Sequence, residues 1–411
     1  MQIFKRILLF VVVVAAWAAV SIYGGLYGWW LSAVAPKGDV DAYMNAQQAL
    51  ITEQNKGNVS WFLYQDGKSH YGQHSAVGDS LDKDTLFPLA SMSKMVAGLA
   101  AAKLSEQGRL DLDAPVSSYL KQWQLAESNF DNDKVTVRAL LSHTAGLGDR
   151  LGFGDYSAEE PLPSTVESLN KPRGSKADVN IAVVREPGSD WSYSGGGYLI
   201  VEHIIEEITG QSYAQYVEEN LLKPLAMQRS SFDYLGKFDN ISNSYDENGK
   251  QVALSQYASK AATALSASSH DMSLLALALL NEKSSAILSQ ASIKQLRKPI
   301  GFQSGAPIWG AGTMLYVPVA NDDFIYGHGG SNDPAINTSI RINPENKSAF
   351  VILATGNKKL AYNMAYEWTL WQSGMPDFLA FETALGSAML PFGIGFVLIV
   401  LFFVFRVFRK A

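Results

Sequence analysis

Two long runs without charged residues dominate the hydrophobic pattern, one near each end of the chain. Residues 7–36 and residues 383–405 contain no Asp, Glu, Lys or Arg. An α-helix rises about 1.5 Å per residue, so roughly 20 apolar residues cross the hydrocarbon core of a bilayer. We therefore expect a transmembrane anchor within residues 7–36 and a second transmembrane helix over residues 383–405.

The first run also has the features of a cleaved signal peptide. Lys5 and Arg6 form a basic n-region, and residues 33–35 (AVA) resemble a cleavage site. However, the run is about twice as long as a usual signal-peptide core. Its end also carries the aromatic residues of an interfacial belt, namely Tyr23, Tyr27, Trp29 and Trp30. We favour a retained anchor and keep the signal peptide as the alternative.

Between the two runs the chain alternates between helical and extended patterns. We expect helices over residues 40–55, 91–107, 198–209, 212–222, 269–281 and 359–375, and strands over residues 58–77, 324–327, 336–342 and 349–355. Residues 150–190 are rich in Pro, Gly and Ser and are predicted to be loops. This order predicts an α/β fold of the α+β type. An antiparallel sheet built from both ends of the domain is flanked by helices, with an inserted, mainly helical subdomain.

The charges are distributed unevenly along the chain. Five of the 33 basic residues flank the uncharged runs, and all 39 acidic residues lie between residues 37 and 382. Basic residues favour the cytoplasmic side of a membrane, so we expect both termini in the cytoplasm. The domain over residues 37–378 would then lie on the periplasmic or extracellular side of the cell (inner) membrane. Its acidity argues against nucleic acid as a partner, and the absence of cysteine excludes thiol chemistry and disulfides.

The chain contains four S-x-x-K sequences, in which a serine and a lysine share one face of a helix. Ser91 and Lys94 differ from the other three pairs because they open an apolar helix directly after the apolar residues 86–90. A lysine amine in an apolar cleft has a lowered pKa and can take a proton from the serine. The other pairs, such as Ser118 and Lys121, lie in polar surroundings that are typical of a solvated surface.

Four blocks in order resemble the serine β-lactamase-like family, which includes class C β-lactamases, D-alanyl-D-alanine carboxypeptidases and related esterases. The blocks are residues 84–94 (DTLFPLASMSK), 140–147 (LLSHTAGL), 187–198 (PGSDWSYSGGGY) and 326–332 (YGHGGSN). Together they span most of the predicted domain. The resemblance implies a serine hydrolase that forms an acyl-enzyme on a small-molecule or peptide substrate with a carbonyl group. Together with the two apolar runs, it leads us to expect a membrane-anchored enzyme with the lipid bilayer as a further partner.

The resemblance also implies roles for individual residues. Ser91 is expected to be the acylated nucleophile, and Lys94 its proton partner. Tyr193 would be the general base for Ser91 and the acid toward the leaving group. His328 would line the opposite wall and orient Tyr193 or the substrate. The remaining positions are the backbone N–H groups of the oxyanion hole, on Ser91 and Ser331, and the substrate-binding glycines, Gly195, Gly329 and Gly330.

Two positions depart from the family pattern. Gly195 ends the second motif where the family usually has an asparagine, so a side-chain amide that would touch the substrate is missing. His328 replaces the lysine with which a β-lactamase holds the carboxylate of its drug, and imidazole is mostly neutral at pH 7. Both changes argue against efficient β-lactam hydrolysis, but they leave acyl transfer to Ser91 intact.

The other histidines are expected to be structural. We interpret His143 as a hydrogen-bonding residue at the end of a helix and His203 as a surface residue beside Glu202 and Glu206. We expect no metal site, because the six histidines show no close ligand spacing, and the proposed chemistry needs no cofactor. The alternative to an enzyme is a non-catalytic, penicillin-binding-like sensor or scaffold module anchored in the membrane.

Overall fold

A computed structural model describes residues 2–149, 155–173, 181–233, 235, 237–280 and 287–408. The chain divides into two compact units. One unit comprises residues 44–365, and the other joins residues 1–43 to residues 366–411. Part of the predicted loop over residues 150–190 lies outside the described residues.

An eight-stranded antiparallel sheet forms the centre of the larger unit, in the order β10-β11-β12-β13-β14-β15-β1-β2. The pairing of β1 with β15 joins the two ends of the domain, as the sequence predicts. The strands are β1 (Asn58–Gln65), β2 (Lys68–Ser75), β10 (Gly301–Gln303), β11 (Ala306–Trp309), β12 (Met314–Val319), β13 (Asp323–Asn332), β14 (Ile336–Asn343) and β15 (Ser348–Thr355).

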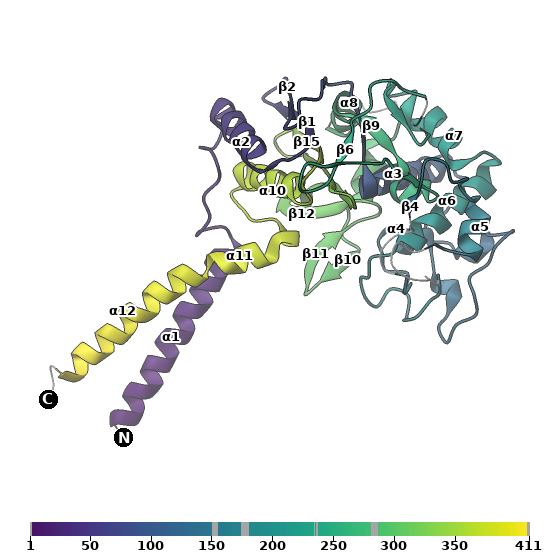
Figure 1. Cartoon of the computed structure of the whole chain (residues 1–411). Coiled ribbons are helices and arrows are strands. Elements are labelled where there is room, and N and C mark those ends of the chain that lie inside the picture. Colours follow the sequence, from purple (N-terminus) through teal and green to yellow (C-terminus); the bar gives the residue numbers. More distant parts are fainter. Residues whose placement is uncertain are drawn as a thin grey trace. The chain divides into compact units, whose positions relative to one another are not determined.

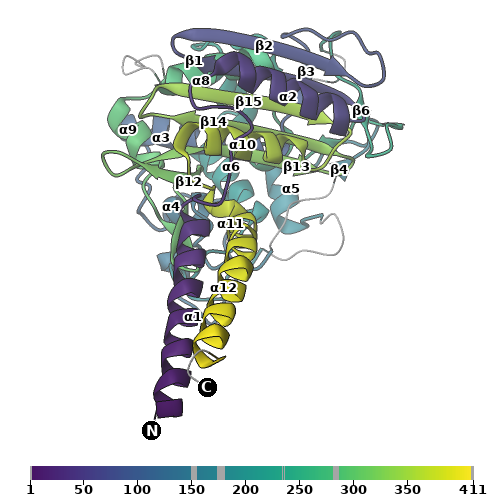
Figure 2. The same ribbon diagram turned by 90° about the vertical axis from the view of Figure 1, so that its left-hand side faces the viewer.

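Helices cover both faces of this sheet. Helix α8 (Ser269–Leu280) packs against β1, β14 and β15. On the other face, Figure 2 shows the parts of α2 (Val40–Gln54) and α10 (Leu360–Ser373) that belong to this unit in front of the strands. All residues of β14 and β15 are buried, because a sheet covered on both faces exposes neither set of alternating side chains.

The chain between β2 and β10 forms the mainly helical part that the sequence predicts. The burial of His203 in this part corrects one expectation from the sequence. His203 lies on α6 with an exposed fraction of only 2%, because α6 is buried on almost every side and not only along one stripe. Besides α8, the α-helices described in this part are α3 (Ser93–Glu106), α4 (Val137–Leu141), α5 (Thr165–Asn170), α6 (Gly195–Thr209), α7 (Tyr213–Val217) and α9 (Gln290–Leu296).

Four short strand pairings connect this helical part. β9 (Ser266–Ser268) pairs with β3 (Leu86–Pro88) and with β5 (Ser230–Ser231). β4 (Asp155–Tyr156) pairs with β8 (Gln256–Tyr257), and β6 (Ser244–Tyr245) pairs with β7 (Gln251–Val252).

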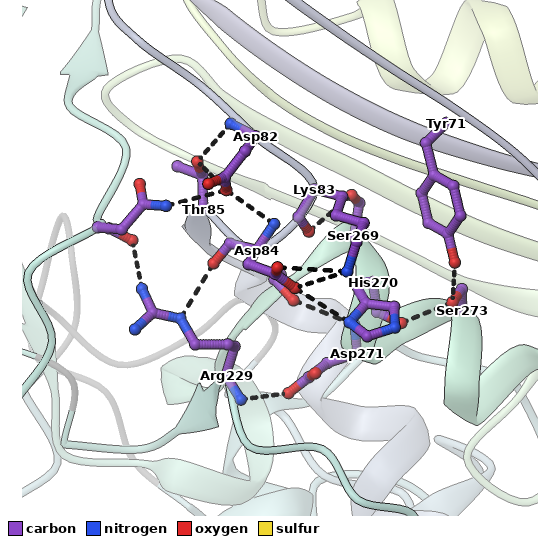
Figure 3. A network of polar contacts seen from close by, with 12 residues as sticks. Tyr71, Asp82, Lys83, Asp84, Thr85, Arg229, Ser269, His270, Asp271 and Ser273 are labelled. Atoms are coloured by element: carbon purple, nitrogen blue, oxygen red, sulfur yellow. Dashed lines mark hydrogen bonds and ion pairs between the residues drawn. The ribbon is translucent and has the colours of Figure 1, made fainter.

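A polar network holds the segment that enters β3 (Figure 3). Arg229 Nε donates to the carbonyl oxygen of Asp84 at 3.0 Å, and the carboxylate of Asp84 lies 3.0 Å from His270 Nδ1. The backbone N–H of His270 donates to the carbonyl of Lys83. Buried Asp271 accepts hydrogen bonds from the backbone N–H of Arg229 and from Ser230 Oγ. The network fixes Lys83 and Asp84, which precede β3 and Ser91 in the chain, to the N-terminal turn of α8.

In the smaller unit, α1 (Gln2–Leu26) runs antiparallel to α12 (Met389–Phe408), and both chain ends lie at the same end of the pair (Figure 1). The short helix α11 (Phe381–Ser387) precedes α12. Both long helices are long and apolar enough to cross a membrane. The helical part of the first run ends at Leu26, ahead of a turn in which Gly28 has a φ of +76°.

Candidate active site

Ser91 lies in the 3₁₀ turn η1 (Ala90–Met92), between β3 and α3. The residue before it, Ala90, has a φ of +51°. The left-handed region costs a residue with a Cβ about 1–2 kcal/mol, so the chain is strained where it presents Ser91. Gly330 of β13 passes directly beside this turn, since a Cβ at Gly330 would lie 2.1 Å from the carbonyl oxygen of Leu89 and 3.0 Å from the backbone nitrogen of Ser91.

Lys94 lies one turn after Ser91 and is 2% exposed. Its Nζ is 3.4 Å from Ser91 Oγ and donates to the carbonyl oxygen of Ala262 at 2.8 Å. The amine also lies over the rings of Tyr193 and Tyr198, at 5.0 and 5.2 Å from their centroids. Burial lowers the pKa of Lys94 to about 7, although the carboxylate of Asp149 counteracts this effect. A substantial fraction of this amine is therefore neutral at pH 7 and can accept a proton.

Tyr193 approaches Ser91 from the segment that leads into α6. Its hydroxyl donates to Ser91 Oγ at 3.0 Å, and its ring stacks on His143 with the centroids 4.3 Å apart. His143 Nδ1 accepts a hydrogen bond from the backbone N–H of Ser194 at 3.0 Å. His143 is thus a hydrogen-bonding residue, as expected, and it also supports the ring of Tyr193. Burial raises the pKa of Tyr193 above its usual value, so its hydroxyl stays protonated at pH 7.

Asp149 holds the N-terminus of α6, and sequence reasoning missed it. Its carboxylate accepts hydrogen bonds from Ser194 Oγ at 2.6 Å and from the backbone N–H of Gly196 at 2.7 Å. A Cβ at Gly196 would lie 3.0 Å from the carboxyl carbon of Asp149, so the glycine allows this close approach. A negative charge at a helix N-terminus is favourable. The only sequence signal was an acidic residue two positions after the 140–147 block.

His328 is fully buried on β13, with an exposed fraction of 0%. Its Nδ1 donates to the carbonyl oxygen of Gly329 at 2.7 Å. The rings of His328 and Tyr193 both contact Trp309, at centroid distances of 5.3 and 5.8 Å. Burial and the charge of Lys94 lower the pKa of His328 to about 3. His328 is therefore a buried, neutral group that shares its contact with Trp309 with Tyr193.

The other predicted positions lie around Ser91 and Tyr193. Gly195 is buried in the first turn of α6. Gly329 faces Tyr362 of α10, since a Cβ there would lie 2.4 Å from the Tyr362 ring. Ser331 follows Gly330 on β13 and is exposed. Among the described residues, no group of three His, Cys, Asp or Glu could hold a metal ion.

The arrangement presents a partly exposed hydroxyl between an amine that is partly neutral at pH 7 and a protonated phenol. Two N–H-bearing segments, η1 and β13, meet at the same point. A hydroxyl within hydrogen-bond reach of such partners can act as a nucleophile, provided that the amine is neutral. Asp149, His143 and the carbonyl oxygen of Ala262 contact this arrangement through hydrogen bonds to Ser194 and Lys94.

Two curated proteins illustrate the sequence similarity of this chain to known proteins. The protein flp of Staphylococcus aureus (strain MW2) is 28% identical over 289 residues, which cover 67% of this chain and 54% of flp. The esterase EstB of Burkholderia gladioli is 33% identical over 166 residues, or 38% of this chain and 40% of EstB. The chain thus spans about half the length, or less, of these curated relatives.

The fold is also found among solved structures. The octameric penicillin-binding protein homologue from Pyrococcus abyssi has a TM-score of 0.68 and 22% identity, covering 82% of this chain and 78% of that protein. The model of the family described as Beta-lactamase matches residues 40–370, which include Ser91, Lys94, Tyr193 and His328. The chain therefore belongs to the Beta-lactamase family of serine hydrolases.

Proposed function

We propose that this chain is a serine hydrolase that works through an acyl-enzyme on Ser91. Ser91 Oγ attacks the carbonyl carbon of an ester or amide, and the neutral amine of Lys94 accepts its proton. The hydroxyl of Tyr193 delivers a proton to the leaving group, and water then releases the acyl group by the reverse sequence. The backbone N–H groups of Ser91 and Ser331 hold the developing oxyanion.

The observation that carries this proposal is the position of Ser91 Oγ. It lies 3.4 Å from Lys94 Nζ and 3.0 Å from the hydroxyl of Tyr193. Burial gives Lys94 a pKa of about 7, which suits a proton acceptor near neutral pH. Because burial also keeps Tyr193 protonated, we assign the first proton transfer to Lys94 and not to Tyr193.

The proposed substrates are esters, amides or peptides, bound without a cation at the position of His328. His328 lies at the position where a β-lactamase has lysine, but it is buried and its pKa is lowered to about 3. Gly195 provides no side-chain amide. The name of the esterase EstB is consistent with ester substrates. We therefore favour an esterase or D,D-peptidase-like activity over an efficient β-lactamase.

The proposed activity is tested by covalent labelling. The full-length chain in detergent micelles is incubated with a fluorophosphonate, and its intact mass is measured. We expect one adduct, lost in Ser91→Ala and retained in Ser118→Ala. Ser118 is the matched control because it belongs to another S-x-x-K pair but is exposed on the turn over residues 116–118. A folded wild-type chain without an adduct would favour the sensor or scaffold alternative.

We also propose that the chain is anchored by both terminal helices, with the domain over residues 37–378 outside the cytoplasm. Two features support this proposal: both helices expose large apolar side chains, and basic residues flank the outer ends of both runs. A retained α1 is supported by its contacts with α12, in which Trp17 Nε1 donates to the carbonyl oxygens of Pro391 and Phe392.

A further inference from the structure

The carbonyl group that binds Lys94 belongs to a π-type turn, η5 (Lys260–Ala264). Such turns are rare and occur frequently at functional sites. The carbonyl oxygen of Ala262 accepts from Lys94 Nζ at 2.8 Å. The next residue, Thr263, accepts a hydrogen bond from Asn332 Nδ2 through its Oγ1, at 3.0 Å. The position of the Lys94 amine therefore depends on where η5 is held.

Glu202 holds the start of this turn from the third turn of α6. Its Oε2 accepts a hydrogen bond from the backbone N–H of Ala261 at 2.9 Å. The side chain is 0% exposed, and its Oε1 is buried without a hydrogen-bond partner among the described residues. Burying a carboxyl with one oxygen unpaired is costly. Its neighbours along α6, Val201 and Ile204, are apolar and fully buried, so helix packing alone does not explain a glutamate here.

The connection between Glu202 and Lys94 does not depend on the charge of Glu202. The carboxylate whose charge raises the pKa of Lys94 is that of Asp149. The charged and titratable groups that face Glu202 are Lys260, Glu206 and Tyr213. Burial raises the pKa of Glu202 to about 8, so at pH 7 most molecules carry it protonated. The connection to Lys94 is instead mechanical, through two consecutive residues: Glu202 binds Ala261, and Ala262 binds Lys94.

We propose that Glu202 is a positioning residue for Lys94, because its hydrogen bond to the backbone of Ala261 fixes the Ala262 carbonyl that directs the lysine amine toward Ser91. This inference rests on the proposed acyl-enzyme function. It predicts that the acceptor atom of residue 202 matters and that its charge does not. The carboxamide of a glutamine has the shape of the protonated carboxyl group. Its oxygen can accept the hydrogen bond from the backbone N–H of Ala261, and its amide nitrogen, a donor, takes the place of Oε1.

The test compares Glu202→Gln with Glu202→Met in the full-length chain in detergent micelles. Glutamine keeps the acceptor, whereas methionine fills a similar volume without it. The first readout is the rate constant for fluorophosphonate labelling of Ser91. We expect the glutamine variant to remain within about threefold of wild type and the methionine variant to fall at least tenfold, with circular dichroism unchanged in both. The proposal is overturned if the two variants behave alike, whether both are active or both impaired.

A second readout does not depend on Ser91. The pH dependence of Lys94 acetylation by acetic anhydride, read by peptide mass, reports the pKa of the amine. Donation to a fixed carbonyl favours the ammonium form, so this pKa should fall in the methionine variant and stay unchanged in the glutamine variant. Equal values in all three chains would contradict the inference even if Ser91 is never labelled. If the methionine variant does not fold, Glu202→Asp replaces it, because it withdraws the carboxyl by one methylene and should show the same losses.

Discussion

At the residue scale, burial and the short distances between Lys94, His143 and His328 favour the uncharged forms of these three side chains. Burial lowers the pKa of Lys94 to about 7 and that of His328 to about 3, and it also lowers the pKa of His143. The charge of Lys94 contributes to the lowered pKa of both histidines. The site therefore admits at most one positive charge near pH 7. The sequence motifs identify the residue types, but these pKa values depend on burial, which only the fold provides.

The first prediction follows from Lys94. If its neutral amine accepts the proton of Ser91, kcat/KM for a p-nitrophenyl ester should rise about tenfold per pH unit below pH 7 and level off above it. The measurement is a pH–rate profile of the full-length chain from pH 5 to 9, with Lys94→Met as the inactive control. A profile that is flat across pH 7 would show that another group accepts the proton.

The same lysine should reduce the stability of the fold. The pKa of Lys94 is about 7 in the folded chain, whereas that of an unperturbed lysine is 10.5. Between pH 7 and pH 10.5 the unfolded chain therefore binds more protons than the folded chain. Lys94→Met should therefore raise the midpoint of thermal unfolding by several degrees at pH 7. The gain should be constant below pH 7 and shrink as the pH rises from 7 toward 10. Melting curves at pH 6, 7 and 9 test the sign, and a gain that grows with pH would refute it.

Gly330 and Gly329 offer a matched pair of substitutions. A Cβ at Gly330 would press on the backbone at Leu89 and Ser91, whereas a Cβ at Gly329 would meet the ring of Tyr362, which is 36% exposed and can turn aside. We expect Gly330→Ala to slow labelling of Ser91 at least a hundredfold and Gly329→Ala to slow it less than tenfold. Labelling rates and melting curves of both variants measure this difference. Equal labelling rates for the two variants would show that the contact between η1 and β13 does not affect the reactivity of Ser91.

At the element scale, the N-terminus of α6 connects Tyr193 to the charge balance at Lys94. Asp149 accepts from Ser194 and Gly196, and its charge raises the pKa of Lys94. Asp149→Asn should therefore shift the acidic limb of the pH–rate profile to lower pH. Asp149→Ala should in addition destabilise the fold by about 2–4 kcal/mol, because buried donors lose their acceptor. pH–rate profiles and urea unfolding measure both effects, and an unshifted limb in the asparagine variant would contradict the electrostatic role.

How far the elements could be predicted depends on whether their signals are local. The helices α3, α8 and α10 and the strands β1, β14 and β15 have clear periodicity, and they were predicted within a few residues. Strands β10, β11 and β12 were missed because they are short or interrupted, as at Pro307 and Pro318. Glu202 and Ala261 are 59 positions apart, so no local pattern could indicate their contact. His203 was expected at the surface because its flanking glutamates suggested a solvated face, and the structure buries it.

At the scale of the whole molecule, most of the exposed large apolar side chains among the described residues lie on or next to the terminal helices. Ile7 of α1 is 58% exposed, and Leu390 of α12 is 72% exposed. Helices that are apolar on every side need a nonpolar environment or a partner. They also contact each other: Phe10 meets Phe403 edge to face, with ring centroids 5.2 Å apart, and a Cβ at Gly395 would collide with the indole of Trp17. A chain cleaved near residue 35 would lose this pairing.

This pairing predicts an uncleaved chain with both ends on one side of the membrane. The intact mass of the protein extracted from membranes should include residues 1–36. The chain has no cysteine of its own, so Lys250→Cys and Gln2→Cys give matched single-cysteine reporters. On whole cells, an impermeant maleimide should label residue 250 at once and residue 2 only after lysis, because basic residues keep the termini in the cytoplasm. The reverse labelling order would overturn the orientation, and a mass lacking the first run would restore the signal-peptide interpretation.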